Sequence, residues 1–346
     1  MSQPLAPART QMADIARLAG YSVSTVSRAL NGCPSVNART RQRITELARS
    51  LHYTVNEGAK NLRHGRSRTV SVVVTADAHA PQPLTDPWTL ALIGAVADEL
   101  SRHGLEMLLT QTDVLHADTV ARAFDSGQAQ GVLVIGWRQD PHALNQLVLR
   151  QVPLVVWGTQ RPDLIACTVG SDDYTGGHAA TAHLLAQGRR RIGFVGDTGL
   201  PEVARRREGY GQALATAGLA VDPGQVCVLN PSTDTAQAQI QAWLSRGNVT
   251  VDAIVAGHDV WALATLRALA ELGLRSPQDV AVVGYGDLTV AQQCQPALSS
   301  ITLPVAQAGE AMVKALLQLV RGEHPRAITM PTALVQRHSS SMPMSA

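Results

Sequence analysis

The sequence is poor in aromatic residues, in cysteine and in long apolar runs. Phe, Trp and Tyr together make up 3% of the 346 residues, so buried cores must be built mainly from Ala, Val, Leu and Ile. The four cysteines, Cys33, Cys167, Cys227 and Cys294, lie far apart without metal-ligand spacing, which argues against a disulfide framework or a zinc site. No stretch approaches the roughly 20 apolar residues of a membrane span, and the first residues contain no apolar signal core. We therefore expect a cytoplasmic protein that needs no metal and no cofactor and has no membrane partner.

The net charge of the chain is only +2, but it is distributed unevenly. Residues 1–68 contain 11 Lys or Arg and 3 Asp or Glu, a net charge of +8, whereas the remaining 278 residues contain 18 and 24, a net charge of −6. A basic segment releases counterions from a phosphate backbone, and an acidic body is repelled by it. The N-terminal segment is therefore a candidate nucleic-acid-binding domain. A solvated basic tail does not fit the helical periodicity of residues 12–51.

Residues 12–30 predict two short helices joined by a tight turn. Gly20 stands where the first helix should end, because glycine adopts a left-handed conformation without steric cost. Ser22 stands where a hydroxyl can cap the next helix. The apolar faces of the two helices are predicted to contain Ile15, Leu18, Ala19, Val26 and Leu30. The opposite face of the second helix carries Ser24, Thr25, Ser27 and Arg28, which suits a DNA major groove, although an ordinary pair of core helices has the same pattern.

A third helix, roughly residues 38–51, would complete a small core through Ile44, Leu47, Ala48 and Leu51. From here the chain resembles the LacI/GalR family of transcription regulators, and the resemblance covers nearly its whole length. The residues that carry it are Asp14–Ala16, Ala19–Gly20, Ser22, Thr25–Arg28, Leu30–Gly32, Thr40–Arg41, Tyr53, Asn56 and Ala59–Arg63.

The resemblance implies a DNA-binding domain at residues 12–54, after a disordered segment at 1–11, and a hinge helix at 55–69. Leu62 matches the leucine that wedges between base pairs in the minor groove, although an inert tether is the alternative for this linker. Val23, Ser24 and Arg28 would meet base edges, and Thr25, Ser27 and Asn31 would meet phosphates. The full set of expected DNA-binding residues is Ser22, Val23, Ser24, Thr25, Ser27, Arg28, Asn31, Tyr53, Asn56, Ala59, Leu62 and Arg63.

Residues 70–346 alternate short apolar runs with amphipathic stretches, which predicts parallel sheets covered by helices on both faces. The predicted strands are 70–75, 131–136, 153–157, 192–196, 253–256 and 280–284; the predicted helices are 88–103, 175–187, 206–217, 260–272 and 305–320. This many repeats indicates two lobes. The resemblance implies a periplasmic-binding-protein-like body whose chain crosses between the lobes near Val169, Ser300 and Ile328. The N-lobe would comprise about 70–168 and 302–327, and the C-lobe about 169–300 and 328–340.

A small molecule would bind between two such lobes, beyond the C-terminal ends of the strands. The candidate effector-binding residues are Asp86, Trp88, Trp157, Gln160, Arg206, His258, Asp259 and Asp287. By resemblance Arg206 clamps the effector, while His258 replaces an asparagine and Gly286 and Gly158 stand where relatives have aspartates. Other roles stay open: Asp259 and Asp287 as helix N-caps, Trp88 as a core residue.

The expected function is therefore that of a transcriptional regulator, a repressor by resemblance, which binds a palindromic operator as a dimer and would be nucleoid-associated when bound to DNA. A sugar or sugar derivative is the expected effector, with a purine as the less favoured alternative. The short Ser- and Met-rich end, 338–346, argues against a tetramer built on a C-terminal coiled coil but does not exclude a tetramer. A solute-binding transport protein would explain the two-lobed body, but it would not explain the basic DNA-binding domain at residues 12–54, called the head below. An enzyme is disfavoured, since Gly284–Gly286 lacks the third glycine of a dinucleotide site and His258–Asp259 has no nucleophile motif beside it.

Overall fold

A computed structural model describes residues 12–30, 33, 35–51, 67–75, 84–112, 116–136, 141–230, 235–247 and 250–341. The chain divides into two compact units, Met1–Ser67 and Arg68–Ala346. The predictions for the segment 1–11, for nearly all of the hinge segment and for Asn31, Tyr53, Asn56, Ala59, Leu62 and Arg63 lie outside the described residues.

The first unit contains three helices, α1 (Met12–Ala19), α2 (Val23–Leu30) and α3 (Ala38–Ser50). Gly20 ends α1 with φ +75°, and the backbone N–H groups of Gly20 and Tyr21 both donate to the carbonyl of Ala16. The buried core of the unit consists of Ile15, Ala16, Ala19, Val26, Ala29, Val36, Ile44 and Ala48. The prediction that Leu18 belongs to this face is wrong, since Leu18 is 53% exposed. Ile15, Ala16 and Ala19 set the direction of the buried face, and Leu18 lies well around the helix from it.

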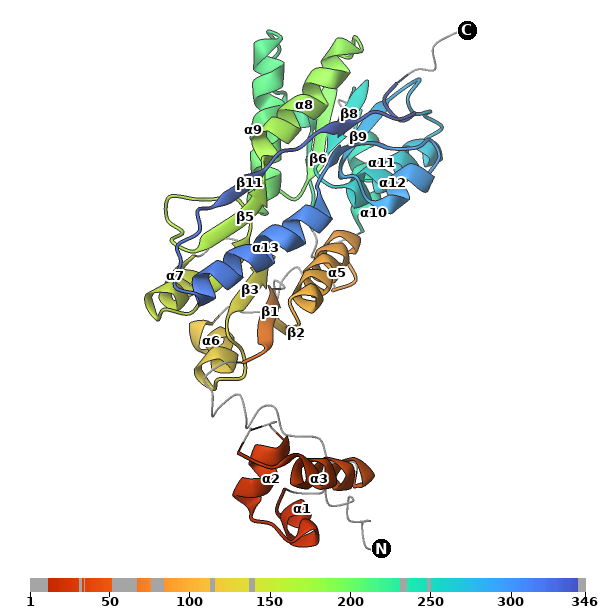
Figure 1. The fold of residues 1–346 in the computed structure, drawn as a ribbon. Coiled ribbons are helices and arrows are strands. Elements are labelled where there is room, and N and C mark those ends of the chain that lie inside the picture. The colour runs from red at the N-terminus through yellow and green to blue at the C-terminus, as the bar shows by residue number, and fades with distance from the viewer. Residues whose placement is uncertain are drawn as a thin grey trace, which may run out of the picture. The chain divides into compact units, whose positions relative to one another are not determined.

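The second unit contains two six-stranded sheets (Figure 1). In spatial order the first sheet consists of β11 (Ile328–Met330), β5 (Cys167–Ser171), β4 (Leu154–Trp157), β3 (Val132–Ile135), β1 (Thr69–Thr75) and β2 (Glu106–Thr112). The second sheet consists of β12 (Leu334–Val335), β10 (Ser299–Thr302), β9 (Ala281–Gly286), β8 (Ala253–Ala256), β6 (Ile192–Gly196) and β7 (Val226–Val228). Paired strands are parallel except β10 and β12. The prediction of two parallel-sheet lobes is confirmed.

Helices cover both faces of each sheet. In the first lobe α5 (Pro87–Arg102) and α13 (Val305–Val320) pack side by side on one face, and α6 (Ala117–Asp125) and α7 (His142–Leu149) cover the other (Figure 1). In the second lobe α8 (Asp173–Ala186) and α9 (Pro201–Thr216) pack closely on one face. The other face carries α10 (Ala236–Leu244), α11 (Asp259–Glu271) and α12 (Thr289–Gln293), and the short 3-10 turn Pro223–Gln225 precedes β7. Apolar side chains between these layers form the cores.

The topology moves each predicted crossing between the lobes to the end of the strand that contains the predicted residue. Val169 lies within β5 and Ile328 begins β11, and both strands belong to the first sheet. Ser300 lies within β10 of the second sheet. The chain therefore crosses after Ser171, after Thr302 and after Met330. Each of these strands still has hydrogen-bonded neighbours at the predicted residue, so the chain leaves each sheet about two residues beyond it.

Candidate nucleic-acid interface and effector cleft

The second helix of the head presents the polar side chains that were predicted to face DNA. Ser22, Val23, Ser24 and Arg28 are exposed, Thr25 and Ser27 are half-buried, and Val26 and Ala29 are buried against the other helices. The hydroxyl of Ser22 accepts from the backbone N–H of Thr25 at 3.2 Å, which confirms the predicted N-cap. At the start of the helix, the hydroxyl oxygen of Ser22 lies 2.9 Å from that of Ser24 and 2.8 Å from that of Thr25. Free N–H groups and hydroxyls at a helix N-terminus favour contact with phosphate.

Arg41, one of the residues that carry the family resemblance, has an internal role. Its Nη2 donates to the carbonyl oxygens of Cys33 at 3.0 Å and of Val36 at 3.1 Å. Asn37 caps the helix that contains Arg41, because its Oδ1 accepts from the N–H of Thr40 at 2.8 Å. These contacts fix the turn that follows α2, so they hold α2 in place without pointing a cation outward.

In the body, two predicted effector contacts, Trp88 and Trp157, lie together. Trp157 ends β4, Trp88 is in the first turn of α5, and their ring centroids are 5.1 Å apart at 43°. Trp88 is 9% exposed and belongs to the buried core, as the alternative role for it predicts, and its Nε1–H is buried without a hydrogen-bond partner among the described residues. Asp86 caps α5 by accepting from the N–H and the hydroxyl of Thr89, each at 2.9 Å. A buried donor without an acceptor costs about 1–3 kcal/mol, so a ligand oxygen here would be stabilising.

His258 belongs to the second lobe and is close enough to Asp86 of the first lobe for that carboxylate to affect its pKa. It follows β8 at the start of α11, and its ring packs edge-on against Trp261 with centroids 5.8 Å apart. Burial lowers the pKa of His258 to about 4; the carboxylate of Asp86 opposes this shift and the charge of Arg206 adds to it. The imidazole is therefore neutral at pH 7 and offers one donor and one acceptor to a ligand.

Arg206 is almost completely buried and held from three sides. Its Nε donates to Oδ1 of Asp173 at 2.8 Å, and its Nη1 donates to the carbonyl of Gly257 at 2.6 Å. Its guanidinium carbon lies 3.8 Å from the ring centroid of Tyr285. Arg206 lies in the second turn of α9, because that helix begins at Pro201 rather than at Arg206 as predicted.

The sequence pattern missed Asp173, Thr159 and Tyr285 as members of this cluster. Asp173 follows Asp172 at the start of a helix, where an acidic residue is ordinarily read as a cap; Asp172 is in fact the cap of α8. Thr159 lies beside the predicted residue Gln160, whose side chain is exposed, and donates its hydroxyl to Asp173 at 3.2 Å. Glycines in α8 and α9 could have indicated that Asp173 lies near Arg206. Gly176, Gly177 and Gly209 are typical of helices that pack closely, and these two helices contain Asp173 and Arg206.

Asp259 and Asp287, also predicted effector contacts, have internal partners. Asp259 is fully buried and accepts from the N–H of Leu288 at 2.7 Å and the hydroxyl of Ser300 at 2.6 Å. Burial raises the pKa of Asp259. Asp287, in a left-handed conformation with φ +50°, forms an ion pair with Arg337 at 2.7 Å. The two carboxylates therefore fix the loop that follows β9, and neither acts as the cap of its own helix.

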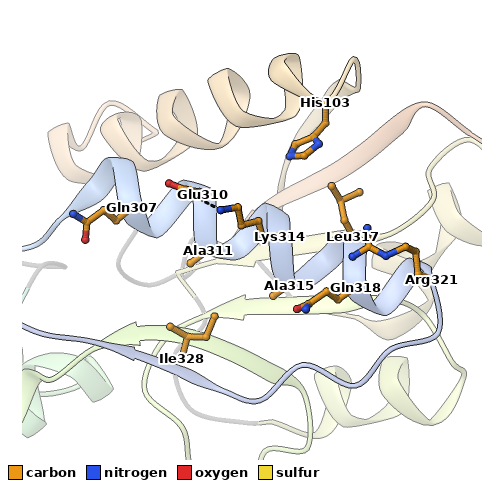
Figure 2. Close-up of a pocket in the computed structure, with 10 residues that line it drawn as sticks. All are labelled: His103, Gln307, Glu310, Ala311, Lys314, Ala315, Leu317, Gln318, Arg321 and Ile328. Atoms are coloured by element: carbon orange, nitrogen blue, oxygen red, sulfur yellow. Dashed lines mark hydrogen bonds and ion pairs between the residues drawn. The ribbon is translucent and has the colours of Figure 1, made fainter.

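A separate cavity of about 590 Å³ lies along the outer face of α13, between the end of α5 and β11 (Figure 2). None of the predicted effector residues lines it. Its charged groups have partners, since Lys314 pairs with Glu310 and Arg321 pairs with Glu323 at 2.7 Å. The cavity is therefore distinct from the cluster around Arg206 and His258.

The described residues contain neither a metal-binding cluster nor a membrane-spanning helix. Among the residues placed in the structure, no group of three or more His, Cys, Asp or Glu side chains could hold a metal ion. No helix in the described part of the chain has both the length and the apolar character needed to cross a membrane.

Comparisons with known proteins agree with both units. The model for bacterial regulatory proteins of the lacI family matches residues 11–56, and that for a periplasmic binding protein-like domain matches residues 181–340. The HTH-type transcriptional regulator CelR of Thermobifida fusca is 31% identical over 331 residues, which cover 94% of this chain and 96% of the relative. The ribose operon repressor of Haemophilus influenzae is 28% identical over 333 residues, covering 95% and 98%.

Solved structures resemble the chain over nearly its full length. A complex of the transcriptional regulator CelR with cellobiose has a TM-score of 0.70 at 30% identity, covering 96% of this chain and all of that one. A Lac repressor dimer bound to operator and the anti-inducer ONPF has a TM-score of 0.84 at 22% identity, which supports the fold alone. With these matches, the chain belongs to the LacI family of bacterial regulatory proteins, whose members are DNA-binding transcriptional regulators and not enzymes.

Proposed function

We propose that the protein is a repressor that binds a palindromic operator as a homodimer. A sugar bound between the two lobes of the body would raise or lower its affinity for the operator. The observation that carries the effector part is the tryptophan pair Trp88–Trp157 with the Nε1–H of Trp88 unpartnered among the described residues. Asp86, two residues before Trp88, is close enough to the neutral His258 to affect its pKa. The observation that carries the operator part is the outward face of α2. The protein would act in the cytoplasm and be associated with the nucleoid while bound to DNA.

The cleft chemistry favours a polyhydroxylated ligand with one apolar face. The half-buried indole of Trp157, backed by the core residue Trp88, would provide an apolar surface for a pyranose ring, and Trp88 Nε1–H would provide a donor for a hydroxyl oxygen. Neutral His258 and the carboxylate of Asp86 provide acceptors for sugar hydroxyls, and Arg206 would contribute the remaining edge of its guanidinium. The relative CelR is known in complex with cellobiose, so cellobiose and related glucosides are the first candidates. Gln160 stays a predicted contact, whereas Asp259 and Asp287 would act by shaping the loop.

In each subunit, the start of α2 would enter one major groove. Val23 and Ser24 are exposed at that start and Arg28 is exposed at its end, so they would contact base edges, with Arg28 as the candidate reader of guanine. Thr25, Ser27 and Asn31 would contact phosphates. Two symmetric half-sites require a dimer. The subunits would pair through the body, where the edge strands β2 and β7 expose Leu109 and Val228.

The effector would control DNA binding by changing the angle between the lobes. Three chain crossings connect the lobes, and the cleft residues come from both of them. A ligand that bridges the lobes stabilises one lobe arrangement by its difference in affinity for the two arrangements. The N-lobe is joined through the linker to the head, so a changed spacing between the two N-lobes of a dimer would change operator affinity.

A thermal-shift screen followed by operator titration tests the proposal. The full-length protein is heated with cellobiose, ribose and a panel of other sugars and sugar acids, and a specific ligand raises the unfolding midpoint by mass action. The hit is then added to a fluorescence-anisotropy titration of a palindromic duplex selected in vitro from random DNA. We expect the operator dissociation constant to change by roughly 5- to 150-fold. A stabilising sugar that leaves operator affinity unchanged would contradict the proposed control mechanism.

A further inference from the structure

Asp173 occupies the first crossing between the lobes and accepts three hydrogen bonds there. Its Oδ1 accepts from Ser171 Oγ at 2.9 Å and from Arg206 Nε at 2.8 Å, and its Oδ2 accepts from Thr159 Oγ1 at 3.2 Å. Ser171 is the last residue of β5, Thr159 follows β4 of the first lobe, and Arg206 belongs to α9 of the second lobe. One carboxylate thus joins side chains of both lobes.

The ion pair between Asp173 and Arg206 is shielded from water. The side chains are 3% and 5% exposed, so each charge depends on the other and on its hydrogen bonds for solvation. The backbone carbonyl of Gly257 and the face of Tyr285 complete the surroundings of the guanidinium. The guanidinium therefore has a defined orientation before any ligand arrives.

The backbone around the pair leaves little room for it to shift. A Cβ atom on Gly177 would lie 2.0 Å from the carbonyl oxygen of Arg206, and one on Gly209 would lie 2.0 Å from that of Tyr174. The α8 and α9 backbones thus touch at glycines on either side of the ion pair. This contact fixes the distance between the backbone of Asp173 and that of Arg206.

We propose that Asp173 is a positioning residue for effector binding: it orients Arg206 toward the cleft and ties that orientation to Thr159 of the opposite lobe. Trp157 is two residues before Thr159, so the same carboxylate that holds the cation of one lobe also holds the segment that carries an indole of the other. Both carboxylate oxygens of Asp173 already accept hydrogen bonds from the protein, so its effect on a ligand would be indirect. The inference rests on the proposed function, because it assigns a role within the same cleft.

The test compares Asp173→Asn with the matched control Asp172→Asn. The Asp173 change keeps the shape of the side chain and removes its charge, whereas Asp172 caps α8 through Thr175 N–H at 3.0 Å and has no side-chain bond to Arg206 or Thr159 in the described structure. Isothermal titration of full-length protein with cellobiose, or with the sugar that the thermal-shift panel identifies, should show roughly 10- to 100-fold weaker binding for Asp173→Asn. The control should stay within about twofold of wild type.

A double-variant comparison separates positioning from a general loss of structure. In an Arg206→Gln background the Asp173 change should weaken sugar binding by less than about a further twofold, because both changes act through one guanidinium. Unchanged sugar affinity in Asp173→Asn or additive losses in the double variant would each overturn the proposal. If Asp173→Asn does not fold, Thr159→Val removes only the bond across the lobes, and a wild-type sugar affinity for that variant would overturn the interlobe link.

A crystal structure of Asp173→Asn without ligand keeps this inference separable from the proposed effector class. If wild-type protein binds no sugar, the effector class fails, but the position of Arg206 can still be measured. We expect its Nη1 to leave the carbonyl of Gly257. An unmoved guanidinium would show that Asp173 does not position it.

Discussion

Replacing Trp88 by Phe should change the stability of the ligand-free protein little but should weaken sugar binding. The change removes the indole N–H but keeps an aromatic ring against Trp157. Because that N–H is buried without a partner, its removal relieves a penalty of about 1–3 kcal/mol, which offsets the cost of the smaller ring. The same N–H is the donor we assign to a sugar oxygen. Sugar binding should therefore weaken roughly 5- to 30-fold, as expected for one lost hydrogen bond of about 1–2 kcal/mol.

Trp243 provides the matched control, since it is also buried but its Nε1–H donates to the carbonyl of Gly224 at 2.9 Å. Trp243→Phe leaves a similar cavity and breaks a satisfied hydrogen bond. Ring-size costs cancel between the two variants, so Trp88→Phe should be the more stable by about 2–4 kcal/mol. Urea unfolding monitored by circular dichroism measures the stabilities, and isothermal titration with the identified sugar measures binding. Equal destabilisation of the two variants, or unchanged sugar affinity in Trp88→Phe, would refute the reasoning.

Leu62→Ala should lower operator affinity while leaving sugar affinity intact, because the wedge contact is made only with DNA; an unchanged operator titration would remove the wedge assignment. Arg28→Ala should cost about 1–3 kcal/mol of operator binding and relax the base preference at one position, which in vitro selection with the variant would detect. For His258 the folded pKa of about 4 lies below the ordinary 6.5, so the unfolded state binds more protons between these values. Its contribution to stability is full above pH 6.5 and is lost, up to about 3 kcal/mol, as pH falls toward 4. His258→Gln should flatten that part of the urea-stability profile against pH, and an unaltered slope would argue against a buried neutral histidine.

Local signals in the sequence predicted the head well. Gly20 and Ser22 mark the turn through backbone conformation and capping, which depend on a few neighbouring residues, and both assignments are confirmed. Leu18 was misplaced because an eight-residue helix offers too few turns to define its buried face by periodicity. The short apolar runs located strands β1, β3, β4, β6, β8 and β9. The edge strand β2 was not predicted, because all of its side chains are exposed or half-buried and it lacks a buried apolar run.

The candidate effector site was harder to predict, because the hydrogen-bond partners of its residues are distant in the sequence. Arg206 was found through the family resemblance, but its acceptor Asp173 is 33 residues away and looks like half of a helix cap. Asp259 is predicted as a ligand contact because it follows a strand, and the sequence gives no sign that its carboxylate accepts hydrogen bonds from Leu288 and Ser300, 29 and 41 residues later. The position of a residue in the sequence shows whether its side chain lies near the end of a strand. It does not show whether that side chain already forms hydrogen bonds with other residues of the protein.

The tryptophan pair gives the protein a built-in optical signal. Five tryptophans occur in the whole chain, and two of them have rings 5.1 Å apart, close enough for their excited states to interact. A ligand seated against Trp88 and Trp157 would change the polarity around both rings and their mutual tilt. Effector occupancy should therefore be readable from near-ultraviolet circular dichroism and intrinsic fluorescence of unlabelled protein, with Trp157→Phe as the variant that abolishes the paired contribution. Such a readout would let ligand binding and operator release be followed in one cuvette.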